Sequence, residues 1–174
     1  IPIMICPSDV AADQFDLFVE LHSDVLDAHS AGEQPLISLP FANYLGVFGN
    51  SEPDDDDDVV DDEPSLPGEG AFIESRPIRL AEFTAGLSNT MWVSERTAAR
   101  LPSSWLGVDG RGEDALCRLV GNAKVGPNCE ECDECEFSSR HDGGVNFLFG
   151  DGRVQFVSEA IDSPTYRRMA QREQ

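Results

Sequence analysis

The chain has 174 residues with 33 acidic and 12 basic side chains, which gives a net charge of −21. This charge excludes binding to nucleic acid and to anionic lipid surfaces, because both need a basic footprint on the protein. The length and the 40% of hydrophobic residues predict a single domain, residues 1–174, with one core. No apolar run reaches the length of about 18 residues that a membrane span needs.

The predicted elements of the N-terminal half are short and mostly extended. Residues 1–6 are predicted to form a strand that ends at Pro7. Residues 15–21 fit both a strand and a helix, and we favour the strand because the next segments are extended and bounded by proline. Residues 41–48 are predicted to form a further strand. Two short strands, residues 71–73 and 91–93, and one helical turn, residues 80–83, complete this half.

A run of acidic residues predicts a surface loop over residues 51–70. Residues 52–63 contain nine acidic side chains, so this segment cannot bury enough apolar surface to compensate its ordering entropy. The run offers candidate Ca²⁺ ligands in Asp54, Asp56 and Asp58. A solvated run is favoured, because consecutive side chains of an extended chain point in opposite directions.

The C-terminal half contains the clearest local signal, a β-hairpin. Residues 145–149 and 154–157 are rich in β-branched and aromatic side chains and flank Asp151 and Gly152. An Asp-Gly pair suits a two-residue turn with positive φ at both positions, so the two runs are predicted to pair. The remaining expectations are weak strands at residues 105–108 and 116–120, a Cys-rich loop at 122–136, and a helix at 163–172 with Ser163 as N-cap and Pro164 in its first turn.

The five cysteines allow two kinds of site. They are Cys6, Cys117, Cys129, Cys132 and Cys135. The last three, together with His141, have the residue types and spacing of a zinc site. In an oxidising compartment, four of the cysteines would instead form two disulfides and leave one over. We favour the disulfides.

His141 and Asp151 are the strongest candidate pair for chemistry. They stand ten residues apart around a tight turn, and we expect their side chains to face one another. One interpretation is a His–Asp acid–base pair, with Ser138 and Ser139 nearby in sequence. The other is a structural histidine whose ring bonds the turn. We favour the structural role, because the sequence shows no third group to orient a catalytic histidine.

Five segments together resemble a known bacterial family. In residues 137–157 (FSSRHDGGVNFLFGDGRVQFV), nine residues separate His141 from Asp151 and Gly152. This spacing resembles the prepilin-type, processing-associated domain that is named for it. Four further segments resemble the same family in order: residues 5–9 (ICPSD), 43–49 (NYLGVFG), 68–72 (GEGAF) and 86–90 (GLSNT), the last leading to Glu95.

The resemblance implies an exported bacterial protein related to the pseudopilins of type II secretion. Such proteins begin with a cleaved signal sequence and a long apolar helix, which this chain lacks. The implied fold is α+β, a predominantly antiparallel β globular head, with residues 137–162 as the signature hairpin. His141, Gly143, Gly144, Asp151 and Gly152 would then have structural roles. The implied function is that of a structural filament subunit, of the type II secretion or type IV pilus kind, and not that of an enzyme.

The resemblance also implies partners and a location. The partners would be copies of the chain or other pseudopilins, and the membrane would be reached only through the missing helix. The protein would lie on the cell surface or in the periplasm, anchored in the inner membrane before assembly. The flanking positions of Cys6 and Cys135 suggest that these two pair, and that Cys117 pairs with Cys129 or Cys132.

Two alternatives remain open at this stage. One is an exported metal-binding module that holds Zn²⁺ in the cysteine cluster or Ca²⁺ on acidic side chains; the turns with Asp142 and Asp151 are further Ca²⁺ candidates. The other is a hydrolase that uses His141. No cofactor is expected with certainty, and Ca²⁺ is the one considered.

Overall fold

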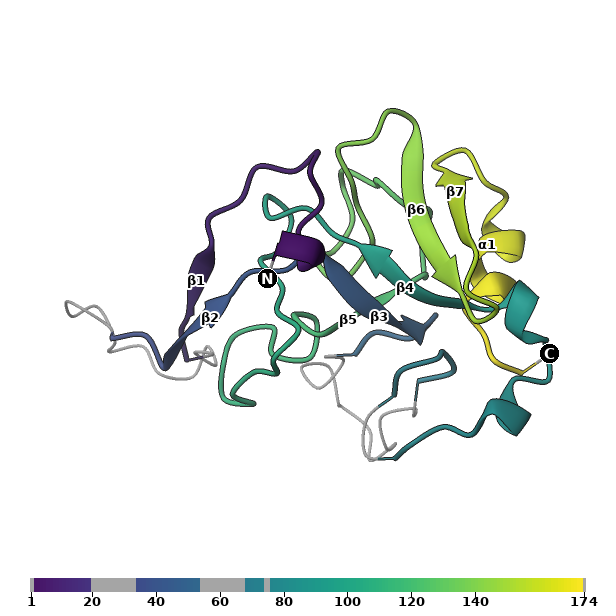
Figure 1. Cartoon of the computed structure of the whole chain (residues 1–174), viewed down its shortest axis with the longest axis horizontal. Helices are drawn as coiled ribbons and strands as arrows, with labels where there is room; N and C mark the ends of the chain where they lie inside the picture. The colour runs from purple at the N-terminus through teal and green to yellow at the C-terminus, as the bar shows by residue number, and fades with distance from the viewer. Residues whose placement is uncertain (1, 20–33, 54–67, 74–75, 174) are drawn as a thin grey trace.

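The computed structural model describes residues 2–19, 34–53, 68–73 and 76–173 (Figure 1). These residues form a mostly β domain with a five-stranded sheet, a separate two-stranded sheet and one short helix near the C-terminus. The predicted fold class is therefore confirmed, and no long helix occurs within the described ranges. Most of the predicted acidic loop, with Asp54, Asp56 and Asp58, lies outside the described residues.

The elements follow one another in a simple order along the chain. They are η1 (Pro2–Met4), β1 (Gln14–Leu17), β2 (Ile37–Pro40), β3 (Tyr44–Gly49), η2 (Leu80–Glu82), η3 (Leu87–Asn89), β4 (Met91–Glu95), β5 (Val120–Asn122), β6 (Gly144–Phe149), β7 (Val154–Ser158) and α1 (Ser163–Met169), where η marks a 3₁₀ helix. Long loops join several of them, so hydrogen bonds outside the strands carry much of the structure.

The five-stranded sheet has the order β5-β3-β4-β6-β7. All neighbours are antiparallel except β3 and β5, which run parallel. The predicted hairpin is confirmed, because β6 pairs with β7 from Gly144 opposite Ser158 to Leu148 opposite Val154. Its predicted two-residue turn is wrong: Gly152 has a positive φ but Asp151 does not, and residues 150–153 lie between the two strands. The two-stranded sheet β1–β2 lies at one end of the molecule, apart from the main sheet (Figure 1).

One face of the main sheet packs against α1 and forms the core. Alternate residues of β6, namely Val145, Phe147 and Phe149, point into this core and are buried. Phe147 makes edge-to-face ring contacts with Phe137 at 5.3 Å and with Tyr166 of α1 at 5.8 Å between centroids. Such aromatic pairs add stabilisation beyond that of the buried area. The core therefore fixes β6 and, with it, the loop that contains His141.

Several predicted elements are wrong. Residues 2–6, the described part of the predicted first strand, do not form a strand, because Pro2–Met4 form η1 and the N–H of Ile5 donates to the carbonyl of Pro2. Residues 71–73 are not a strand, although the N–H of Phe72 donates to Val47 of β3. Residues 105–108 and 116–119 form turns and irregular backbone, and β5 begins only at Val120, the last residue of the second predicted strand.

The predicted C-terminal helix exists but is shorter than expected, and its cap differs. Asp162, not Ser163, is the N-cap, because its carboxylate accepts a hydrogen bond from the N–H of Thr165. Pro164 occupies the first turn as predicted, where its missing N–H costs nothing. The helix ends at Met169, three residues before the predicted end.

Buried arginines hold the loops together. The guanidinium of Arg96 is fully buried and donates to the carbonyl oxygens of four loop or strand-end residues, namely Cys117, Val120, Cys135 and Glu136. Arg118 donates to Pro102 and Glu113, and Arg172 donates to Gly68 and Gly70. Because irregular backbone leaves carbonyls without strand partners, these side chains supply the donors that a sheet would otherwise provide.

Candidate functional site

Three side chains that are far apart in sequence meet beside the main sheet. Sγ of Cys6 lies 3.6 Å from Nε2 of His141, and Oε1 of Glu95 lies 3.4 Å from the same nitrogen. The three ligand atoms all lie within 4.8 Å of one another, and the structure shows one such group among its described residues. We call Cys6, Glu95 and His141 the Cys6 cluster.

Three different parts of the fold supply these side chains. Cys6 follows η1, and its backbone N–H donates to Oδ1 of Asn43 at 2.8 Å. Glu95 is the last residue of β4, directly opposite Tyr44 of β3. His141 lies in the loop before β6, where its N–H donates to Oγ of Ser139. The cluster thus forms only when the sheet, the N-terminal turn and this loop are all in place.

A second set of contacts fixes the orientation of the cluster. Asn146 donates to Oε1 of Glu95 twice, from its backbone N–H at 3.0 Å and from its side-chain amide at 3.1 Å. Glu95 and Cys6 are 2% and 4% exposed, whereas the His141 side chain is 30% exposed. The thiol and the carboxylate are therefore held in the protein, and the imidazole forms the side that faces solvent.

Asp9 anchors the N-terminal turn that carries Cys6. Its buried carboxylate accepts hydrogen bonds from Asn43, from the N–H of Ala98 and from the guanidinium of Arg140. Burial alone would raise the pKa of Asp9, but these donors outweigh burial and leave the pKa lowered. The ionised carboxylate links the loop after η1 to Asn43 just before β3, to Ala98 after β4, and to Arg140, the neighbour of His141.

Burial also sets the protonation of Cys6. The pKa of the Cys6 thiol is raised, first by desolvation and further by the neighbouring Glu95 carboxylate, although backbone donors at Ser8 and Asp9 oppose this. Tyr44 also has a raised pKa, first from burial and then from the charges of Cys6 and Glu95. Cys6 is therefore a neutral thiol at pH 7, and the nearby Tyr44 is a neutral phenol.

An open hollow lies beside His141, the exposed side of the cluster, whereas Cys6 and Glu95 do not line it. His141 lines it, together with Ser139, Arg140, Asp142 and Gly143 from the same loop. Asn128 and Glu159 border the hollow from other parts of the chain. A small ion or molecule in this hollow would meet the imidazole before the buried thiol and carboxylate.

The predicted facing of His141 and Asp151 is wrong. The two residues lie before and after β6, so the whole length of the strand separates them. Asp151 instead serves the hairpin turn, where its Oδ1 accepts a hydrogen bond from the N–H of Arg153. Asp142 and Asp151, the two separate Ca²⁺ candidates of these turns, are both exposed.

The glycines of the signature have conformational roles. Gly143 and Gly152 have φ of 77° and 89°, which L side chains rarely adopt. At Gly144 a Cβ atom would lie 2.2 Å from the carbonyl oxygen of Val157, so only glycine allows β6 and β7 to pair closely there. These positions shape the two ends of the hairpin.

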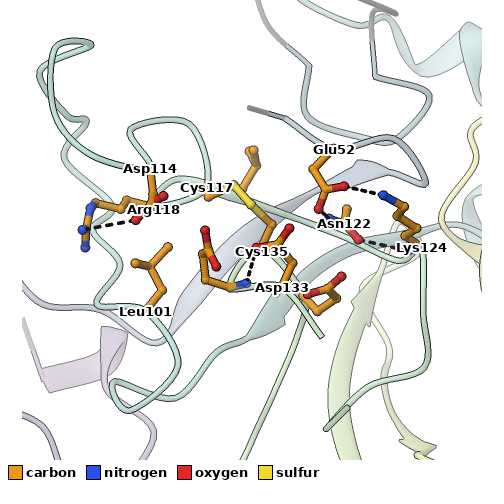
Figure 2. The surroundings of a disulfide bond; sticks show 12 residues. Glu52, Leu101, Asp114, Cys117, Arg118, Asn122, Lys124, Asp133 and Cys135 are labelled. Atoms are coloured by element: carbon orange, nitrogen blue, oxygen red, sulfur yellow. Dashed lines mark hydrogen bonds and ion pairs between the residues drawn. A yellow bond between two sulfur atoms is a disulfide. The ribbon is translucent and has the colours of Figure 1, made fainter. Parts of the chain in front are cut away.

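The cysteines form disulfides, but not in the predicted pairs. Cys117 is bonded to Cys135, and Cys129 to Cys132, while Cys6 is free. Figure 2 shows the Cys117–Cys135 bond beside β5, with Asn122 and the Lys124–Glu52 ion pair close by. Cys6 does not pair with Cys135, because Cys135 is bonded to Cys117, and the backbone of Cys6 is held instead by the side chain of Asn43.

These bonds also remove the predicted zinc set. Cys129, Cys132 and Cys135 are all oxidised, so they supply no thiolate to a metal beside His141. Arg100 donates to the carbonyls of Cys129 and Cys132 and fixes the small disulfide ring. Disulfides are typical of oxidising compartments outside the cytosol. None of the helices within the described ranges has the length and apolar character that a membrane crossing needs.

The sequence pointed to the three residues of the Cys6 cluster separately but not together. Cys6 was expected in a disulfide, His141 opposite Asp151, and Glu95 only as the end of a motif. A signal was nevertheless present: residues 5–9, 86–90 and 137–157 are three of the five segments that carry the family resemblance. Cys6 and His141 lie in two of them, and Glu95 follows the third.

The fold and site define a small, disulfide-bonded, mostly β domain with one cluster of metal-ligand side chains. The chain belongs to the family described as "Protein of unknown function (DUF1559)", whose profile matches residues 1–164. This domain is commonly found in proteins with a prepilin-type N-terminal cleavage segment, so the resemblance is confirmed at the level of the family. No curated protein and no solved structure matches the chain.

Proposed function

We propose that this chain is the head domain of an exported, pilin-like filament subunit with a structural role. The observation that carries the proposal is the family match over residues 1–164, because this domain commonly accompanies a prepilin-type N-terminal segment. The two disulfides support it, since they suit the periplasm or the cell surface. The pseudopilin relationship predicted from the sequence is part of this proposal.

In this proposal, assembly and spacing are divided between two parts of the subunit. A cleaved and processed apolar stem would polymerise, and the head described here would sit on the outside of the filament. The partners would be copies of the same subunit or other pseudopilin-like subunits. A head that is tied by buried arginines and disulfides suits such a role, because irregular loops on a filament surface are exposed to proteases.

The acidic surface would then affect packing between heads. Heads with a net charge of −21 repel one another at short spacing, and divalent cations such as Ca²⁺ would relax that repulsion. This effect needs no dedicated Ca²⁺ site. It predicts that chelators and low salt loosen the assembly.

Expression of the natural gene in its own host tests the proposal. We expect the mature N-terminus, read by mass spectrometry, to follow a prepilin-type cleavage site with an apolar helix after it. We also expect the protein in the fraction sheared from the cell surface. A strain without prepilin peptidase is the control and should retain the uncleaved form. A natural gene product without such a helix, or a protein that is never cleaved, would contradict the proposal.

The hydrolase alternative finds no support in the surroundings of His141. Its imidazole lies against Cys6 and Glu95, and the nearby Ser139 hydroxyl accepts the backbone N–H of His141 instead of contacting the ring. We therefore propose no catalytic role. The metal-binding alternative is favoured by the Cys6 cluster, with ligands other than those predicted.

A further inference from the structure

We propose that the Cys6 cluster is a metal site that binds one Zn²⁺-like ion through Cys6 Sγ, Glu95 Oε1 and His141 Nε2. This inference does not depend on the filament role. It rests on the convergence of sulfur, nitrogen and oxygen ligands from three segments of the chain. Zn²⁺ accepts this combination of thiolate, imidazole and carboxylate.

The distances fit the edges of a tetrahedral site. With bonds of about 2.3 Å to sulfur and about 2.05 Å to nitrogen or oxygen, tetrahedral angles put sulfur and nitrogen about 3.6 Å apart and nitrogen and oxygen about 3.4 Å apart. The corresponding distances in the cluster are 3.6 Å and 3.4 Å. Two of the three ligand separations therefore match those that an ion between the ligands requires, and the third, from Sγ to Oε1, lies within 4.8 Å.

The same geometry disfavours a hydrogen bond between His141 and Glu95, although the 3.6 Å contact of Cys6 with His141 is within range for a sulfur hydrogen bond. An N–H···O hydrogen bond spans about 2.7–3.2 Å, whereas His141 Nε2 and Glu95 Oε1 are 3.4 Å apart. The hydrogen bonds of normal length to this oxygen come from Asn146. The imidazole is thus held next to the carboxylate without a close bond to it.

A catalytic triad is also disfavoured. In a triad the histidine contacts the nucleophile with one ring nitrogen and the orienting acid with the other. Here the thiol of Cys6 and the carboxylate of Glu95 both approach Nε2. Two groups on one nitrogen cannot relay a proton through the ring, but they can share a cation with it.

The surroundings match those of other protein metal sites. Metal ligands are usually oriented by further hydrogen bonds, and loss of such a bond weakens binding about 10–100-fold. Asn146 supports Glu95, Asn43 holds the backbone of Cys6, and Ser139 holds that of His141. Three protein ligands leave a fourth tetrahedral position, and the half-exposed imidazole places that position toward the open hollow.

The site also explains the odd cysteine. All five cysteines lie among the described residues, and four are oxidised in pairs, so Cys6 remains a thiol in a domain that otherwise suits an oxidising compartment. Coordination would protect that thiol from oxidation and from exchange with the disulfides. Since the chain positions Glu95 and His141 around it, Cys6 is placed as a ligand and not as a leftover thiol.

Titration with Co²⁺ tests the proposal directly. The protein is purified with its disulfides intact, stripped with chelator and titrated with Co²⁺, whose thiolate complexes absorb in the near ultraviolet. We expect saturation at one equivalent and loss of the band when Zn²⁺ is added. Absence of the thiolate band, or a signal that does not saturate at one equivalent, would overturn the proposal.

Variants assign the ligands. Cys6→Ser should abolish the thiolate band, and Glu95→Gln and Asn146→Ala should each weaken Co²⁺ binding at least about 10-fold. Glu159→Gln is the matched control, because Glu159 borders the same hollow outside the cluster and should leave the Kd unchanged. An unchanged Kd in Cys6→Ser would overturn the assignment.

A second measurement on the unmodified chain guards against a variant that fails to fold. Alkylation of the Cys6 thiol should slow at least about 10-fold when one equivalent of Zn²⁺ is bound, because a coordinated thiolate is blocked. Alkylation at the same rate with and without Zn²⁺ would contradict the site even if no variant could be studied.

Discussion

At the scale of single residues, buried charge organises the loops of this domain. Arg96 is fully buried, and burial lowers its pKa to about 9, so it remains a cation at pH 7. Its guanidinium donates hydrogen bonds to the carbonyls of Cys117, Cys135 and Glu136, which all lie in loops outside the strands. One side chain thereby replaces several ladder hydrogen bonds.

We predict that Arg96→Met destabilises the fold strongly. The substitution leaves several buried carbonyls without donors, and each unpaired buried group costs about 1–3 kcal/mol, so the free energy of unfolding should fall by about 4 kcal/mol or more. The urea midpoint measures this. Arg111→Met is the control, because Arg111 is exposed and pairs only with Asp109, and its midpoint should stay close to that of the unchanged chain. Equal midpoints for both variants would contradict the role of Arg96.

Glu136 gives a prediction on pH dependence. Burial raises its pKa from 4.5 to about 7, and the charges of Glu52 and Asp133 add to this while Arg100 opposes it. Because the folded state binds the proton more tightly than the unfolded state, Glu136 favours folding fully below about pH 4.5 and loses this contribution as the pH rises through about 7.

Glu136→Gln should therefore raise the free energy of unfolding at pH 8.5 by on the order of 2 kcal/mol and bring no gain at pH 4. Urea unfolding at several pH values gives the difference between the two proteins. The pKa of Glu134 is also raised to about 7, mainly by its hydrogen bond with Asp133, but its titration is common to both proteins and cancels. Glu131→Gln, an exposed charge loss, is the control and should show no such pH trend. A difference that is constant with pH would refute the prediction.

The role of a single residue could be predicted from the sequence when its bonding partners are close to it along the chain. Asp151 and Gly152 were assigned to the turn correctly, because a turn is decided by its own residues. The partners of Cys6 are Glu95 and His141, which lie 89 and 135 positions further along the chain. No local sequence pattern spans such a separation, so the contact could not be predicted. The one indication of this contact was that the segments near these residues resemble the same family in the same order.

At the scale of elements, the sequence predicted those whose signals are local. The hairpin β6–β7, strand β3 and strand β4 follow from alternating side chains and turn residues. Residues 2–6 and 71–73 have strand-like composition but form no strand. Met4 and Cys6 each share one hydrogen bond with Asn43, just before β3, and Phe72 shares one with Val47 of β3, so neither segment builds a ladder. Strand composition alone cannot tell these cases apart.

The two disulfides should contribute unequally. Cys117–Cys135 spans 18 residues and contains the Cys129–Cys132 ring, which spans only 3. Replacing Cys117 and Cys135 by Ala should lower the free energy of unfolding by about 3 kcal/mol, since a longer closed loop removes more entropy from the unfolded chain. Replacing Cys129 and Cys132 by Ala should cost less. The urea midpoints of the two double variants measure the two effects. A larger loss for the Cys129 and Cys132 variant would show that loop entropy does not determine the stabilisation.

At the scale of the whole molecule, the charge is more one-sided at the surface than the composition suggests. The chain has only 12 basic residues, and Arg96, Arg118 and Arg172 are buried, where they bind carbonyls of the loops. Fewer cations are therefore left at the surface to balance 33 acidic residues. Such a surface repels itself and destabilises the compact state at low salt.

Stability should therefore rise with ionic strength. Between about 0.01 M and about 0.5 M NaCl the Debye length falls from about 30 Å to below 8 Å, so repulsion across the domain is screened. We expect the free energy of unfolding to rise by about 1 kcal/mol, which corresponds to a few degrees in Tm. Thermal unfolding of the chain in NaCl and in CaCl2 at matched ionic strength separates screening from specific Ca²⁺ binding. Equal Tm values in NaCl and CaCl2 would show that Ca²⁺ acts only by screening. A Tm that falls as the salt concentration rises would contradict the self-repulsion of the acidic surface.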